Sequence, residues 1–215
     1  MKQQLLDTVS INYDPRVELI GAAGYFHAQG WMLGTAGNLS AKMPDGSFWI
    51  TGSGKSKGKL SQEDFVRVYP DGSIQAPLEE SVKPSAETSI HSSIYELFPD
   101  AQACYHVHSV DANLVSNFIK GDEIPLPPLE MIKGLGIWEE NPNCVMPLFD
   151  NHLKVPQIAS DIKTRFLAQK PQIPALLIRN HGVTVWANSL ETARNYIEIT
   201  EFVFRYMVAA RKAGI

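Results

Sequence analysis

The stretch AQACYHVHSV (101–110) decides how this sequence is interpreted. It begins as an apolar strand and ends in His106-Val107-His108. On a strand, residues two apart point to the same face, so both imidazoles can reach one metal ion. Such a pair alone is as often polar surface or a hydrogen-bonded core group. Its place at the end of an apolar strand, where a chain leaves the core, favours a functional site.

A catalytic metal with an open position needs a third protein ligand. His181 is the candidate, because IRNHGV places it at another expected strand end, before a glycine that lets the backbone approach closely. The alternative for His181 taken alone is an ordinary turn histidine. The remaining three of the six histidines, which lie in expected helices or a polar loop, are His27, His91 and His152.

Two carboxylates compete for general acid–base work. Glu87 lies in the first turn of an expected helix (84–98), where its alternative role is to complement the helix dipole. An i,i+4 hydrogen bond to Glu87 is the simplest explanation of His91. Glu130 lies among apolar residues in LEMIKG, a setting that raises a carboxyl pKa into a useful range. Its alternative is an acid on a surface loop.

Composition places the chain among globular proteins. It has 215 residues, of which 44% are hydrophobic and 20% charged, enough for one large domain over residues 1–215. A net charge of −4 argues against general nucleic-acid binding, because no basic excess faces the phosphates. Two cysteines, Cys104 and Cys144, are too few for a disulfide framework. Without a signal peptide or long apolar run, we expect a soluble cytoplasmic protein and no membrane partner.

Turn and helix signals alternate along the chain. Two PDGS sequences between apolar runs (44–47 and 70–73) predict tight hairpins. Strands are expected at 101–108 and, in two pieces, over 175–187, with an irregular section at 121–150. The expected helices are 15–29, 84–98, one capped by Ser109 and carrying Val110 and Leu114, 154–168, and 189–212 capped by Asn188. Hairpins with interspersed helices indicate a mixed or antiparallel sheet covered by helices.

The sequence ITGSGKSK (50–57) is similar to the end of a nucleotide-binding P-loop. That loop needs a glycine where Trp49 stands and a helix directly after it, and neither condition is met. A Gly/Ser/Lys loop after a strand can still hold one phosphate through backbone N–H groups.

The chain resembles the class II aldolase/adducin superfamily over nearly its whole length. The resemblance is carried by five motifs in order, TAGNLS (35–40), ITGSG (50–54), KPSAE (83–87), YHVHS (105–109) and RNHGV (179–183). It implies an α/β protein, a three-layer α/β/α sandwich with a central mixed, mainly antiparallel sheet. It also implies a homotetramer with each site near a subunit boundary.

The resemblance further implies roles for individual residues. One Zn²⁺ per subunit would be held by His106, His108 and His181, with Glu130 as the catalytic acid/base. Glu87 matches the acid/base position of the superfamily's aldolases and is expected to contact substrate or metal here. The implied phosphate contacts are Asn38, Ser53, Gly54 and Ser85, while Ala86 stands where aldolases commonly have a second serine.

Within the superfamily, EMIKG (130–134) together with RNHGVTVW resembles the lyases that dehydrate 5-methylthioribulose 1-phosphate in methionine salvage. The implied partner is therefore a small phosphorylated sugar. Two alternatives remain at this point. One is a sugar-phosphate aldolase or pentulose-phosphate epimerase of the same superfamily, and the other is an adducin-like scaffold module without catalysis.

Overall fold

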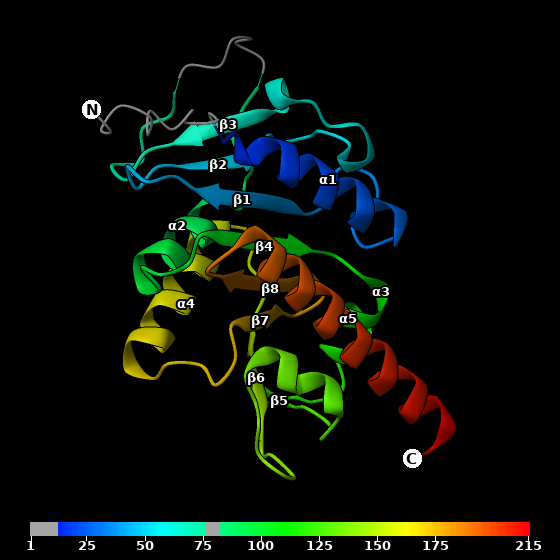
Figure 1. The fold of residues 1–215 in the computed structure, drawn as a ribbon. Coiled ribbons are helices and arrows are strands. Elements are labelled where there is room, and N and C mark those ends of the chain that lie inside the picture. The colour runs from blue at the N-terminus through cyan, green and yellow to red at the C-terminus, as the bar shows by residue number, and fades with distance from the viewer. Residues whose placement is uncertain (1–12, 76–81) are drawn as a thin grey trace, which may run out of the picture.

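The computed structural model describes residues 13–75 and 82–215, and its centre is one eight-stranded sheet (Figure 1). The strand order is β3-β2-β1-β4-β8-β7-β6-β5, and each neighbouring pair is antiparallel except β6 with β7. The strands are β1 (Asn38–Lys42), β2 (Phe48–Thr51), β3 (Phe65–Val68), β4 (Ala103–Val107), β5 (Glu123–Pro125), β6 (Val145–Phe149), β7 (Ala175–Ile178) and β8 (Gly182–Ala187). The predicted mixed, mainly antiparallel sheet is confirmed.

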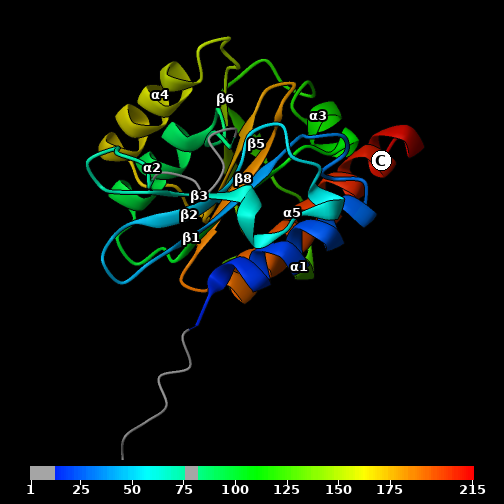
Figure 2. The same cartoon turned by 90° about the horizontal axis from the view of Figure 1, so that it is seen from above.

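Helices cover both faces of this sheet (Figure 2). One layer contains α1 and α5, which pack on β1, β4 and β8, while α2 and α4 pack together on the opposite face. The α-helices are α1 (Pro15–Ala28), α2 (Thr88–Leu97), α3 (Val110–Val115), α4 (Val155–Ala168) and α5 (Leu190–Ala213). In the described part of the chain, the short 3-10 helices are η1 (Lys57–Lys59), η2 (Gln62–Asp64) and η3 (Glu130–Leu135). These layers form the predicted α/β/α sandwich.

The pleat of β4 separates the two hydrophobic cores. Tyr105 and Val107 belong to the core beneath α1 and α5, and Cys104 belongs to the core beneath α2 and α4. Since alternate residues of a strand share a face, His106 points with Cys104 toward α2. The same alternation puts Thr184 of β8 on the α2 side of the sheet. Both cysteines are buried and free.

Most of the predicted elements are confirmed. The hairpin from β1 to β2 turns through the first PDGS sequence, and Val68 pairs with Ile74 across the second. β4 and the β7–β8 pair lie where strands were expected, and α1 and α4 begin and end within one residue of expectation. Among the described residues, no helix is both long and apolar enough to span a bilayer. The assignment of residues 1–215 to one domain stays a prediction.

Two local predictions were wrong. α2 begins at Thr88 instead of residue 84, because Pro84 is bridged to Gly52 in an extended conformation. The cap of α5 is Ser189, whose hydroxyl accepts from the Thr192 amide, and not Asn188. Ser109 caps α3 as predicted, and α3 carries Val110 and Leu114, which are exposed while Ala112 and Val115 are buried.

Gly182 lies at the tightest backbone contact between β4 and β8. A β-carbon at this position would lie 2.1 Å from the Val107 carbonyl oxygen and 3.0 Å from Cδ2 of His108. Backbone cannot move aside as a flexible side chain does, so β8 can only pair with the end of β4 if its first residue is glycine. The contact sets the separation of the segments that carry His108 and His181.

We predict that Gly182→Ala lowers the free energy of unfolding by about 1–3 kcal/mol, the usual cost of overpacking. Gly21→Ala is the matched control, since Gly21 lies in α1 with open space around it. That control gains about 0.5–1 kcal/mol from helix propensity. Chemical denaturation measures both, and equal stabilities for the two variants would contradict the steric argument.

Candidate metal centre

The three predicted histidine ligands come together at adjacent strand ends. His106 is the fourth residue of β4 and His108 follows its end, so the strand alternation predicted from sequence directs both to the α2 side. β8 pairs antiparallel with β4, with His106 opposite Thr184. The β7–β8 turn therefore lies beside His108, and it carries His181.

Glu87 joins the three histidines. One ligand atom from each of these four residues lies within 4.8 Å of all the others. Nε2 of His106 is 2.8 Å from Nε2 of His108, and Nε2 of His181 is 2.6 Å from Oε1 of Glu87. The imidazole rings stand nearly at right angles, with interplanar angles of 77°, 81° and 88°. Four donor atoms thus converge on one small volume.

Burial favours the neutral forms of His106 and His108. It lowers the pKa of His106 well below its usual value and that of His108 to about 4. Burial alone would raise the pKa of Glu87, but the imidazoles of His106 and His181 and the Asn38 amide outweigh it and hold this pKa well below the usual range. Neutral imidazole and ionised carboxylate are the states that bind metal.

This donor set fits a divalent transition metal. Three imidazole nitrogens and one carboxylate oxygen are ligands that zinc accepts, and related metals accept them too. The Thr184 hydroxyl contacts Nδ1 of His106 at 2.8 Å, which leaves Nε2 to face the other ligands. A metal-binding cluster of three histidines and one glutamate is therefore present.

α3 and its continuation hold the His181 turn, a role that sequence reasoning missed. The Asn113 amide donates to the His181 carbonyl at 3.1 Å, and the Ser116 hydroxyl accepts from the Asn180 backbone at 3.0 Å. Arg179 donates to the Ser116 carbonyl at 2.5 Å. Because α3 starts directly after His108, one short segment fixes two of the ligands.

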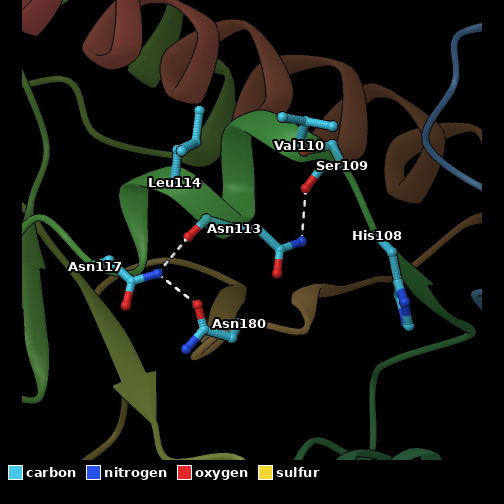
Figure 3. Close-up of a pocket in the computed structure, with 7 residues that line it drawn as sticks. All are labelled: His108, Ser109, Val110, Asn113, Leu114, Asn117 and Asn180. Atoms are coloured by element: carbon cyan, nitrogen blue, oxygen red, sulfur yellow. Dashed lines mark hydrogen bonds between the residues drawn. The ribbon is translucent and has the colours of Figure 1, made fainter.

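A pocket of about 310 Å³ opens beside His108 (Figure 3). Its wall includes exposed Val110 and Leu114, and the amides of Asn117 and Asn180 meet across it at 2.5 Å. Space for a small substrate therefore adjoins the cluster on the side where His108 is 26% exposed.

The predicted phosphate segments also lie together. Gly52 is bridged to Pro84, and the Ser53 amide donates to the Lys83 carbonyl, so the ITGSG loop runs beside KPSAE. Ser53 and Gly54 are exposed, and Gly54 has a φ of 72°. The Asn38 side chain is buried and faces Glu87 and His91. The contacts of these residues with a phosphate stay predictions.

Lys57 is a second residue that the sequence did not single out. It is 2% exposed, and its Nζ donates to the carbonyls of Thr35 and Lys55, tying two loops together. Burial lowers its pKa to about 8, against the opposing influence of Glu87. Lys55, in contrast, pairs with Asp64 at 2.8 Å.

Glu130 lies apart from the cluster of the four converging residues. It begins η3, its side chain is 84% exposed, and it pairs with Lys133 at 2.9 Å. Its neighbours in sequence are apolar, as predicted. The Glu130 side chain itself, however, lies in solvent and not among apolar side chains. Its catalytic role stays a prediction.

We predict that the purified protein retains a divalent metal and that His108→Ala loses it. Removing a hydrogen-bond partner of a ligand typically lowers metal affinity by roughly 10–100-fold. Removing a direct ligand should lower the affinity by more than that. His152→Ala is the control, because His152 pairs with Asp161 on the surface. Metal analysis after dialysis decides, and a metal-free wild-type protein would contradict the prediction.

Comparison with known proteins supports this geometry. Residues 17–208 match the model of the class II aldolase and adducin N-terminal domain family. A methylthioribulose-1-phosphate dehydratase of Microcystis aeruginosa is 64% identical over 92% of this chain and 96% of its own length. The Leptospira biflexa protein of the same name is 44% identical over 91% of this chain and 96% of its own length.

Among solved structures, YgbL of Escherichia coli, described as a putative aldolase/epimerase/decarboxylase, aligns with a TM-score of 0.75 at 27% identity. The alignment covers 91% of this chain and 88% of YgbL. The ordered motifs, the sheet and these relatives agree: the chain belongs to the class II aldolase and adducin family, among its methylthioribulose-1-phosphate dehydratases.

Proposed function

We propose that this protein removes water from 5-methylthioribulose 1-phosphate and releases 5-methylthio-2,3-dioxopentyl phosphate. The observation that carries the proposal is the 64% identity to a dehydratase of that name over nearly the full length of both chains. The metal-binding cluster supports it, because the reaction needs an acidified carbon next to a ketone. The enzyme is a hydro-lyase of methionine salvage.

A bound Zn²⁺, the metal that we propose, supplies Lewis-acid polarisation of the C2 ketone and so acidifies the C3–H bond. His106, His108 and His181 would hold it, with Glu87 completing the set. Glu87 is poorly suited to act as a general acid/base, because its low pKa keeps it ionised. We therefore assign Glu87 to metal and substrate positioning, and the acid/base work to another group.

Glu130 is the acid/base of the proposed mechanism. Its carboxylate takes the proton from C3, and the same carboxyl group then protonates the C4 hydroxyl as it leaves as water. The resulting enol tautomerises to the diketone. An exposed Glu130 outside the cluster of its own chain suits the proposed homotetramer, in which a neighbouring subunit borders each site.

The remaining parts of the proposal concern binding and place. Ser53, Gly54 and Ser85, on the two adjoining loops, would hold the C1 phosphate with Asn38 beside them. A sizing column tests the homotetramer. Location in the cytoplasm stays a prediction from the sequence.

The experiment that tests the function is incubation with 5-methylthioribulose 1-phosphate and mass analysis of the product. We expect a product lighter by one water. Cleavage into two carbon fragments would instead identify an aldolase, an unchanged mass with inverted stereochemistry an epimerase, and unaltered substrate with metal-loaded protein a scaffold.

We predict that Glu130→Gln keeps its metal and loses turnover by about 10²–10⁴-fold, the usual contribution of a general acid/base. Glu139→Gln is the matched control and stays active, because Glu139 lines the same second surface pocket, of about 240 Å³, that Glu130 lines. Near wild-type activity of Glu130→Gln would remove Glu130 from the mechanism. Co-expression with His108→Ala then asks where Glu130 acts: restored activity places it in a neighbouring subunit's site.

A further inference from the structure

A chain of buried polar side chains leads from the metal centre into α2, and of its members the proposed function gives a role only to Asn38. The Asn38 amide contacts Oε2 of Glu87 and, at 2.5 Å, Nε2 of His91. Nδ1 of His91 lies 2.6 Å from the Ser40 hydroxyl, which lies 2.7 Å from the Tyr95 hydroxyl. The prediction of a direct His91–Glu87 side-chain bond is therefore wrong, because Asn38 lies between them.

The donor at each link near Glu87 follows from chemistry. An ionised carboxylate only accepts, so Asn38 must present its NH₂ to Glu87 and its oxygen to His91. An amide oxygen also only accepts, so Nε2 of His91 must carry a proton. His91 is fully buried and its pKa is lowered to about 4. The ring is therefore neutral, and Nδ1 is an acceptor.

The outer links follow in the same way. An accepting Nδ1 on His91, 2.6 Å from the Ser40 hydroxyl, takes its single proton in preference to the Cys104 carbonyl, which lies 3.3 Å away. Ser40 then has only lone pairs to offer Tyr95, so the Tyr95 hydroxyl donates to it. Each bond of the chain is polarised toward Glu87. If the Asn38 amide were flipped, its oxygen would face the Glu87 carboxylate, and both are acceptors. If His91 carried its proton on Nδ1, its bare Nε2 would face the Asn38 oxygen, and these are acceptors too. Such a pair is unfavourable in a buried site.

We infer that His91 and Ser40 are positioning residues, which fix the Asn38 amide and thereby hold the Glu87 carboxylate against the three imidazoles. With Oε2 occupied by Asn38, Oε1 is the atom that lies 2.6 Å from His181 and 4.0 Å from His108. Outer partners of this kind set metal affinity through the orientation of a ligand. The inference rests on the metal centre of the proposed function and not on the identity of the sugar.

The first test reads the tautomer of His91 in the metal-free wild-type protein by ¹⁵N NMR of its ring. We expect a neutral ring with the proton on Nε2. A proton on Nδ1 would reverse the whole chain and overturn the inference. Because this measurement uses neither substrate nor turnover, a failed dehydratase assay leaves it unaffected.

The second test measures Zn²⁺ affinity by competition with a chelator. His91→Leu removes both links and is expected to weaken binding about tenfold or more. His91→Gln restores an N–H that can reach the Asn38 oxygen and should recover most of the loss. Ser40→Ala, a smaller change in the same chain, gives an intermediate loss and decides the case if His91→Leu does not fold.

Ile94→Ala is the matched control, since Ile94 is a fully buried residue of α2 in the hydrophobic core beneath α2 and α4. It lowers the melting temperature without touching the polar chain, so its Zn²⁺ affinity stays that of the wild type. Wild-type affinity in both His91→Leu and Ser40→Ala would overturn the inference. An equal loss in Ile94→Ala would reduce His91 to a packing residue.

Discussion

Three imidazoles and a carboxylate share one small volume at the end of β4, and the surrounding structure serves to hold them there. Such a cluster is costly to bury, because polar groups taken from water need partners. The fold supplies those partners on each side: Thr184 for His106, Asn38 for Glu87, and the α3 segment for the His181 turn. The sheet fixes the separation of the strands, the hydrogen bonds of Thr184 and Asn38 fix the rotation of His106 and Glu87, and the α3 segment fixes the backbone at His181.

The electrostatics of the centre follow from the same arrangement. Burial favours the neutral forms of His106 and His108, and the Glu87 carboxylate beside them is held ionised, which favours a divalent cation. Buried Lys57 lies within the influence of Glu87, yet its ammonium is engaged by two backbone carbonyls and acts on the loops. The Glu87 carboxylate is thus the charge that is available to attract the metal ion. Glu130 is exposed and paired with Lys133, and it is not part of this group of charges.

The sequence predicted what depends on local periodicity. Alternation along β4 correctly placed His106 and His108 on one face, and turn chemistry correctly located the β1–β2 hairpin. The partners of Glu87 depend on pairing between distant strands: Asn38 lies between Glu87 and His91 only because β1 pairs with β4. Lys57 was missed for a similar reason, since a lysine in a Gly/Ser loop gives no sign that the loop closes over it. Alternation and strand-end position supplied the three histidine candidates, and the ordered family motifs added their assignment to one Zn²⁺.

The ligands come from three separate places: the residue before α2, the end of β4 and the turn between β7 and β8. No two of these segments are brought together by a local turn, so the centre exists only after the long-range pairing of β4 with β8 is complete. A metal ion that binds only the native state adds stability by mass action. A metal ion that binds the native state but not the folding transition state slows unfolding and leaves the folding rate nearly unchanged. The bound metal would thus govern how long each folded molecule lasts.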